Sequence, residues 1–293
     1  MSIIMEDTQK IKQVALLSIA FSVIVLLLKF MAYWYTGSVS VLSDALESFV
    51  NVASTSLSYA IIIVAKAPAD KNHPYGHDKA EYFASGGEGV LIVLAAVTIF
   101  AYSIEKLLHG YELASINSGI LIAVFAALIN AIIAKILLKT SNKYKSIALE
   151  ANARHIITDI WTTVVVVTGL VIIKFFPTLS WIDPILALLL SLFIFYTGAK
   201  LIKSSVDGLM DISLPNDEIL TITSIIQEAI PNDCCIESMR TKYQGSKRFV
   251  DFKLIVSGEM SVKNSHAICD LVEEAINKIF PGSITIIHVE PRK

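Results

Sequence analysis

Residues 147–174 read IALEANARHIITDIWTTVVVVTGLVIIK, and this stretch decides how the chain folds. Its length and apolar character predict a helix that spans a membrane. His155 and Asp159 nevertheless stand inside it, four residues apart, so that their side chains share one helical face. Asn152 and Thr162 extend the same polar stripe by one turn on each side. An imidazole and a carboxylate at bilayer depth are costly unless something compensates them, so the stripe predicts a ligand.

Residues 40–65, SVLSDALESFVNVASTSLSYAIIIVA, repeat this arrangement earlier in the chain. Glu47 and Asn51 are again four residues apart, and Asp44 and Ser54 flank them. Two polar stripes with oxygen and nitrogen donors, each inside an apolar helix, predict a cation site between the two helices.

Composition places the chain among integral membrane proteins. Hydrophobic residues make up 54% of it, charged residues 17%, and the mean hydropathy is +0.64. The net charge of −2 and the lack of a basic, aromatic-interleaved patch argue against nucleic acid as a partner.

Apolar runs long enough to cross a bilayer predict six transmembrane helices, at about 13–35, 40–65, 84–108, 117–139, 147–174 and 179–202. Alternate connections carry the lysines, which by the positive-inside rule marks them as cytoplasmic. These lysines are Lys10, Lys12, Lys66, Lys71, Lys79, Lys135, Lys139, Lys143, Lys145, Lys200 and Lys203. We therefore expect a multi-pass protein of the inner (cytoplasmic) membrane with both termini in the cytoplasm.

Lys29 lies inside the first predicted span. Its side chain either snorkels to a membrane interface or pairs with a buried acid.

A change of character after Leu214-Pro215 predicts a second domain, and we place the boundary between residues 1–208 and 209–293. Helical periodicity over 216–230, capped by Asn216, precedes alternating strands at 234–242 and 247–257 around the turn Gln244-Gly245-Ser246. A helix capped by Ser261 follows over 261–280, with a last strand over 283–290. The order α-β-β-α-β predicts a small cytoplasmic α/β domain.

The three cysteines, Cys234, Cys235 and Cys269, all fall in this domain. A cytoplasmic location disfavours disulfides, and adjacent cysteines in a strand point to opposite faces. They are structural thiols, or alternatively metal contacts or redox sensors.

Two further clusters carry metal-ligating residue types. Asp70, His73 and His77 lie in the loop after the second span, a donor set that suits zinc, although a polar loop with capping roles explains them too. His288 and Glu290 share a face of the last strand, and His266 comes from the helix before it. Isolated histidines of this kind are more often ordinary surface or core residues.

Several segments together resemble the cation diffusion facilitators, bacterial efflux carriers for divalent transition metals. The resemblance covers nearly the whole chain and rests on the following segments: Thr36-Gly37-Ser38, SDALESFVN at 43–51, DKNHPYGHDKAE at 70–81, Ala151 to Asp159, Phe280-Pro281-Gly282 and Ile287-His288. It implies six transmembrane helices, a metallochaperone-like cytoplasmic domain, a homodimer and exchange of metal for protons.

The resemblance also implies three metal sites. The transport site falls on Glu47, Asn51, His155 and Asp159, the loop site on Asp70, His73 and His77, and the cytoplasmic site on His266, His288 and Glu290. The family further implies a salt bridge between Lys79 and Asp211.

Two departures from the family pattern affect the expected chemistry. Glu47 and Asn51 replace a pair that commonly includes His or Asp followed by Asp, so oxygen donors dominate and manganese or iron(II) suit the site as well as zinc. Glu237 and Lys253 stand where some relatives carry histidines. Because a protonated lysine cannot ligate a metal, one cytoplasmic metal is expected to be absent and replaced by a fixed charge.

The sequence therefore predicts a proton-coupled antiporter that exports zinc, iron(II) or manganese, with the metal as substrate and regulator and the bilayer, protons and a second copy of itself as partners. Two alternatives are an intramembrane metallohydrolase, disfavoured because no His-Glu-x-x-His segment occurs, and a membrane-tethered metal sensor that does not transport. The sensor leaves the two polar stripes unexplained, and we expect no enzymatic activity.

Overall fold

A computed structural model describes residues 2–65, 67–110, 112–144, 147–245 and 247–292. It contains two units: one joins the residues up to Tyr59 with Gly87–Ile202, and the other joins Ala60–Gly86 with the residues from Lys203 onward. Residues 60–86, which connect the second and third long helices, thus belong with the C-terminal part of the chain. Each compact unit is therefore built from two separate stretches of sequence.

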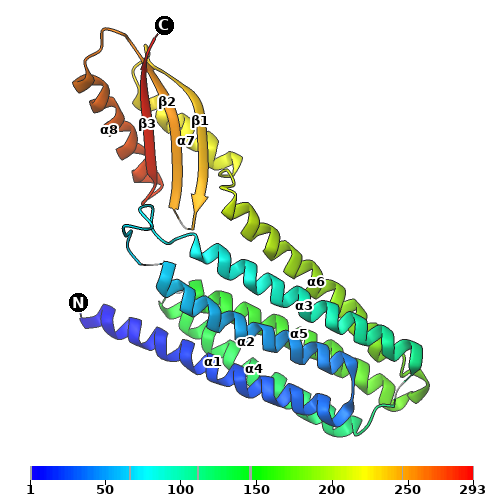
Figure 1. Cartoon of the computed structure of the whole chain (residues 1–293). Helices are drawn as coiled ribbons and strands as arrows, with labels where there is room; N and C mark the ends of the chain where they lie inside the picture. Colours follow the sequence, from blue (N-terminus) through cyan, green and yellow to red (C-terminus); the bar gives the residue numbers. More distant parts are fainter. Residues whose placement is uncertain (1, 66, 111, 145–146, 246, 293) are drawn as a thin grey trace. The chain divides into compact units, whose positions relative to one another are not determined.

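Six long helices form the first part of the chain (Figure 1). They are α1 (Ser2–Thr36), α2 (Val39–Ala65), α3 (Ala80–His109), α4 (Ile116–Tyr144), α5 (Ile147–Phe175) and α6 (Ile182–Leu209), with a short 3-10 turn at Pro177–Leu179 before α6. Among the described residues, five are long and apolar enough to cross a membrane. The remaining helix, α2, has 27 residues and carries Asp44 and Glu47. The predicted fold class, a helical membrane region followed by an α/β domain, is confirmed.

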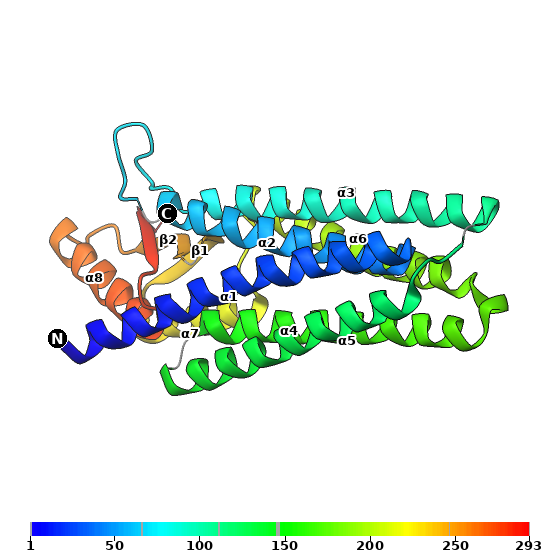
Figure 2. The ribbon, with the colours of Figure 1, turned by 90° about the horizontal axis from the view of Figure 1, so that it is seen from below.

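The helices pack through small apolar groups of side chains. One group joins α1, α4 and α5 around Leu137 and Ile156, and α4 contacts both of the other helices. A second joins α2, α3 and α6 around Val39, Ile99 and Ala187. The helices run alongside one another in both Figure 1 and Figure 2. A third group around Ala32, Val41 and Leu170 joins α1, α2 and α5, so α5 and the part of α2 up to Tyr59 belong to one unit.

The predicted turn Thr36-Gly37-Ser38 separates α1 from α2. Gly37 has φ +64°, a left-handed conformation that glycine adopts without a steric penalty. The Thr36 hydroxyl donates to the carbonyl of Ala32 (2.8 Å) and accepts from the Ser38 amide (3.2 Å). These bonds end α1 and turn the chain directly into α2.

A buried carboxylate, Asp183 of α6, caps the beginning of α2. It accepts hydrogen bonds from the amide of Val39 (2.7 Å), the hydroxyl of Ser38 (2.6 Å) and both the amide and the hydroxyl of Ser40. The first amides of a helix have no partner within the helix and favour negative charge. Asp183 therefore anchors α2 to α6 at one end.

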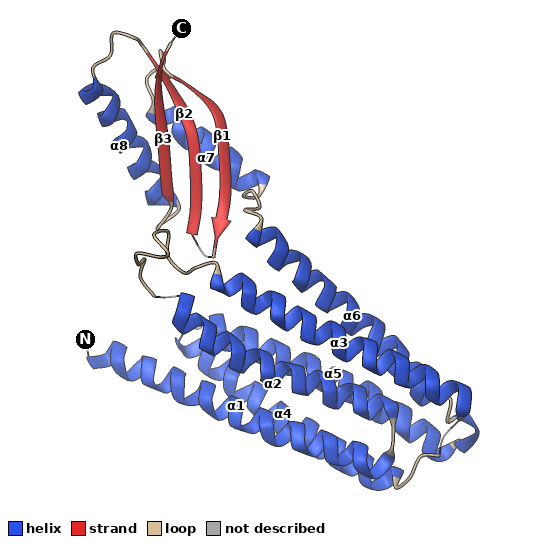
Figure 3. Cartoon of the chain, in the orientation of Figure 1, coloured by secondary structure: helices blue, strands red, loops and turns tan. Residues whose placement is uncertain are grey.

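The C-terminal domain is a three-stranded sheet with two helices (Figure 3). Its elements are α7 (Asn216–Ala229), β1 (Cys235–Gln244), β2 (Lys247–Val256), α8 (Val262–Ile279) and β3 (Ile284–Pro291). Strand β2 is central, antiparallel to β1 and parallel to β3. The predicted order α-β-β-α-β is confirmed, with each boundary within about two residues, as is usual for helix and strand ends.

Alternate residues of β2 form the core of this domain. Val250, Phe252, Leu254 and Val256 are buried together with side chains of α7 and α8, so both helices cover one face of the sheet. The opposite face carries charged residues, including Asp251 and Lys253 of β2. Charge clusters on the sheet are therefore placed away from the apolar core.

One of the two predicted helix caps is wrong. Pro215, rather than Asn216, is the cap residue of α7, and it makes no side-chain cap bond; proline before the first turn presets the backbone instead. Ser261 does cap α8, with its hydroxyl accepting from the amide of Asn264 at 3.3 Å.

Charged contacts join the 60–86 segment to the C-terminal domain within the second unit. Lys79 Nζ lies 2.9 Å from Asp211 Oδ1, which confirms the predicted pair, and Lys242 binds the other carboxylate oxygen at 3.2 Å. Both lysines hold the pKa of Asp211 below its ordinary value, with the Lys79 hydrogen bond as the main cause. Asp78 pairs with Lys247 at 2.8 Å.

Candidate metal sites

The two polar stripes face each other across α2 and α5. Asn51 Nδ2 lies 3.3 and 3.4 Å from the two carboxylate oxygens of Asp159. Asp159 is 7% exposed, so its carboxylate depends on protein partners. Thr162, predicted as part of the stripe, donates to the Asp159 carbonyl at 3.0 Å. The expected contact between the second and fifth spans is therefore present in the structure.

Cavities lie on two sides of this contact. One, of about 290 Å³, is lined by Glu47, Asn51 and His155, with Glu88 of α3. The other, of about 30 Å³, is lined by Asn51, His155 and Asp159 together with neutral polar side chains such as Asn130 and Asn152. Asn152 Nδ2 donates to the Ser18 hydroxyl at 3.0 Å within that lining. All four predicted transport ligands thus line one or both of two adjacent cavities.

These four residues share a region but their ligand atoms do not converge on one point. Among the described residues, the acidic and imidazole ligand atoms of Glu47, His155 and Asp159 do not all lie within 4.8 Å of one another. Carboxylate and amide oxygens with one imidazole nitrogen suit divalent transition metals. Holding a cation here would require the ligand atoms of Glu47, His155 and Asp159 to come closer together.

Lys29 is paired with a buried acid, which settles the two interpretations of this residue. Its ammonium lies 2.8 Å from Asp44 Oδ1, and the side chains are 1% and 3% exposed. The snorkelling interpretation is wrong because Asp44, one turn before Glu47, sits on the facing helix.

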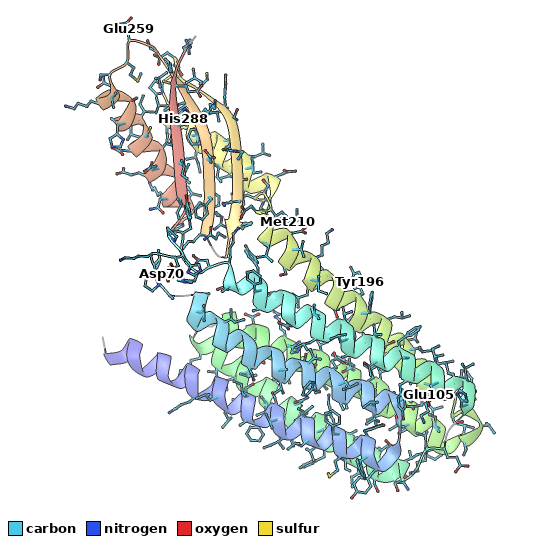
Figure 4. The ribbon with its side chains drawn as sticks, in the orientation of Figure 1. Asp70, Glu105, Tyr196, Met210, Glu259 and His288 are labelled. Atoms are coloured by element: carbon cyan, nitrogen blue, oxygen red, sulfur yellow. The ribbon has the colours of Figure 1, made fainter. Side chains whose placement is uncertain are left out.

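The loop cluster is the one place, within the described part of the chain, where three such ligands converge. Ligand atoms of Asp70, His73 and His77 all lie within 4.8 Å of one another. Asp70 lies 3.3 Å from His73 Nδ1 and 3.4 Å from His77 Nε2, and the two rings are 3.2 Å apart at their nitrogens. Figure 4 marks Asp70 in the loop that follows α2. This geometry can hold a metal ion.

Asp70 also has the capping role that was the alternative interpretation. Its carboxylate accepts from the amides of His73 (2.7 Å) and Asn72 (2.8 Å). Those bonds, the His73 amide foremost, hold the pKa of Asp70 below its ordinary value. The carboxylate is therefore ionised and preorganised for a cation at neutral pH.

The predicted cytoplasmic cluster is brought together only in part. His288, labelled on β3 in Figure 4, lies 3.4 Å from Glu290, and Lys253 Nζ lies 2.6 Å from the same carboxylate oxygen. His266 instead pairs with Asp270 on α8 at 3.7 Å and is 75% exposed. Within one chain, His266 does not join His288 and Glu290.

Lys253 occupies the centre of this cluster. It stands opposite Glu237 on β1 and His288 on β3 in the strand register. The hydrogen bond to Glu290 raises the pKa of Lys253 above its ordinary value. The predicted fixed charge is thus present, as an ammonium bound to Glu290.

Cys234 and Cys269 are buried in the domain core and Cys235 is exposed. Burial raises the pKa of the Cys234 and Cys269 thiols, which favours the structural interpretation.

Glu88 is a cavity-lining carboxylate that sequence reasoning missed. It lies in the segment Gly86-Gly87-Glu88-Gly89 of α3 and lines the cavity that Glu47 and His155 line. The signal was present: a single carboxylate within an apolar span is costly unless it faces a cavity or partner. Next to it, Gly89 lets α3 approach α6 closely, because a Cβ there would lie 3.0 Å from the Gly198 carbonyl.

Comparison with known proteins covers both parts of the chain. The family model for the cation efflux transmembrane domain matches residues 15–210, and that for the cation efflux protein cytoplasmic domain matches residues 214–292. An uncharacterized transporter of Synechocystis sp. is 38% identical over 277 residues, covering 94% of this chain and 89% of that protein. The cation-efflux pump FieF of Escherichia coli is 28% identical over 286 residues, covering 96% and 93%.

Among solved structures, the metal-bound C-terminal domain of the CzcD transporter from Thermotoga maritima is 26% identical, with a TM-score of 0.24. It covers 27% of this chain and 94% of that domain.

Two matched domains in the expected order, together with a relative that is similar over nearly the full length, leave one assignment. The chain belongs to the cation efflux, or cation diffusion facilitator, family, whose members are multi-pass membrane transporters and not enzymes.

Proposed function

We propose that this protein is a proton-coupled antiporter that exports zinc, iron(II) or manganese from the cytoplasm. The observation that carries the proposal is the contact between Asn51 of α2 and Asp159 of α5 inside the bundle, with Glu47 and His155 lining the adjoining cavities. Polar side chains that meet inside an apolar bundle mark a path for an ion.

Competition between metal and protons would couple the two fluxes. A metal that reaches Glu47, His155 and Asp159 displaces protons, because metal ligands must be deprotonated. Rocking of the bundle would then open the site to the other side, where protons compete the metal off. If metal and protons compete for the same side chains, the proton gradient can drive metal export without any further coupling device.

The C-terminal domain and the loop would regulate transport. The domain from about residue 209 would form a homodimer and bind metal through His288, Glu290 and His266, with His266 contributed from another copy, since it does not reach the others within its own chain. The loop residues Asp70, His73 and His77 would hold a further ion. Both termini would face the cytoplasm at the inner membrane.

Transport by the purified protein in liposomes tests the proposal. Uptake of zinc, iron(II), manganese, cobalt and cadmium should be measured with and without an imposed pH gradient. Flux of at least one metal should rise with the gradient and should be accompanied by opposite movement of protons. Metal binding without flux would instead support the sensor alternative, which the C-terminal domain alone would allow. Asp159→Ala, in the same liposomes, distinguishes carrier flux from leakage.

A further inference from the structure

A buried ion pair adjoins the proposed transport site without belonging to it. Lys29 of α1 and Asp44 of α2 are 2.8 Å apart and almost completely excluded from solvent. Burying such a pair costs desolvation that mutual attraction barely recovers, so stability alone gives little reason to keep it. A role in function would explain why the pair is present.

Asp44 lies among several hydrogen-bond donors. Besides Lys29, the hydroxyl of Thr163 lies 2.9 and 3.1 Å from its two oxygens, and that of Thr162 lies 3.3 Å from one of them. The pair is therefore held by residues of α1, α2 and α5.

The same threonines connect the pair to the site. The hydroxyls of Thr162 and Thr163 also lie 3.0 and 2.8 Å from the main-chain carbonyl of Asp159. Electrostatically, Asp159 and Glu47 both act on Lys29 as well. A change of charge at Lys29 or Asp44 is thus felt at the groups that would bind the metal.

The opposite charges of the pair bear on the charge of the neighbouring cavities. Lys29 neutralises Asp44, so the carboxylates that line the two cavities are those of Glu47, Glu88 and Asp159. We propose that Lys29 and Asp44 are positioning residues whose opposite charges cancel beside the transport region, so that a divalent cation there meets only the groups that line the cavities. The ammonium would exclude a second cation, and it would keep metal binding weak enough for release.

This inference rests on the proposed transport site, and the test separates the two. Zinc binding to the full-length protein should be measured by calorimetry in a His73→Ala/His77→Ala background, which removes the loop cluster. Loss of one bound zinc in Asp159→Ala would identify the ion held in the bundle. If Asp159→Ala binds as much zinc as its parent, the proposed site fails and so does the inference.

Four variants in that background then test the charge balance. Lys29→Gln should tighten binding of the bundle zinc, and Asp44→Asn should weaken it, each by about tenfold or more, since nearby unit charges interact strongly in a bundle of low dielectric constant. The double variant Lys29→Gln/Asp44→Asn restores the charge and should bind within about threefold of its parent, because the two opposite effects cancel. Lys29→Arg keeps the charge and should also bind like the parent.

A purely structural role predicts a different pattern. Both single variants would then shift affinity in the same direction, or Lys29→Arg would shift it as far as Lys29→Gln, and either result would overturn the inference. Gel filtration and circular dichroism establish that each variant is folded. If a single variant fails to fold, the double variant and Lys29→Arg still test the inference. Zinc affinities far from that of the parent in both of these variants would contradict it.

Discussion

Two lysine–carboxylate pairs, one in the helix bundle and one on the C-terminal sheet, show how little a distance says about an interaction. Lys253 and Glu290 are closer, at 2.6 Å, than Lys29 and Asp44, at 2.8 Å. Yet the side chains of the first pair are 41% and 33% exposed, and those of the second are 1% and 3% exposed. Water replaces a lost partner on the sheet, whereas in the bundle the remaining charge stays uncompensated.

The largest expected effect separates the two regions by function. Asp159→Ala and His155→Ala should lower proton-driven metal flux by on the order of 100-fold or more, because each removes a ligand from the proposed site. His288→Ala, on the sheet, should retain most of the flux. The measurement is uptake into liposomes with matched protein amounts, and near-normal flux in either bundle variant would sink the site assignment.

Breaking the buried pair should have the next largest effect. Asp44→Ala leaves the Lys29 ammonium buried without its partner and should lower the free energy of unfolding by about 3–5 kcal/mol. Glu290→Ala is the matched variant on the sheet. Thermal unfolding in detergent, followed by circular dichroism, compares them. Similar melting temperatures for the two variants would contradict the comparison.

The exposed loop cluster of Asp70, His73 and His77 differs from the two lysine–carboxylate pairs, because its expected cation is a metal ion and not a lysine ammonium. His73→Ala/His77→Ala should reduce bound zinc by one ion per chain while transport continues, because the loop lies outside the apolar part of the helices. Elemental analysis after gel filtration measures the stoichiometry. An unchanged metal content would show that the loop binds no metal, which leaves the capping role that Asp70 already performs.

Glu218 and Arg248, with side chains 19% and 27% exposed, fall between the two pairs. Two hydrogen bonds of 2.8 and 2.9 Å from Arg248 hold the pKa of Glu218 below its ordinary value near 4.5. This stabilisation is therefore present above pH 4.5 and is lost as pH falls through the lower, folded-state pKa. Glu218→Gln should cost about 1 kcal/mol or less at pH 7 and nothing once the acid is protonated. Unfolding curves at several pH values check this, and a cost that grows on acidification would reverse the sign.

The smallest effect is expected at Lys253. Lys253→Met should leave the melting temperature of the full chain unchanged within error, because water solvates the Glu290 carboxylate it exposes. The same variant also removes the ammonium from between Glu237, His288 and Glu290. If a metal ion then binds there, calorimetry will detect an additional site. If metal binding is unchanged, the ammonium is not what prevents it, and the cluster has too few metal ligands.

Local patterns predicted most of the fold. Helical and strand periodicity placed all five elements of the C-terminal domain, and hydropathy placed the six long helices, because both signals are carried by neighbouring residues. Asn216 was mistaken for a cap because asparagine favours that position, while the structure uses the preceding Pro215.

Partners distant in sequence were harder to predict. The stripe around Glu47 included Asp44, but spacing cannot show that Lys29 lies opposite it after the Gly37 turn. Likewise, donor type placed His266 with His288, whereas its position on α8 turns it towards Asp270. Helix packing and strand register decide such pairs, and one sequence reveals neither.

The Asp183 cap holds the Val39 end of α2, so this end would be the pivot if the helix tilted. Glu47 lies about 12 Å and Asn51 about 18 Å along the helix from that pivot, at 1.5 Å per residue. A tilt about the capped end would therefore move Asn51 about one and a half times as far as Glu47. The two positions would then shift by different amounts relative to α5, so such a tilt would separate the ligands of the proposed transport site.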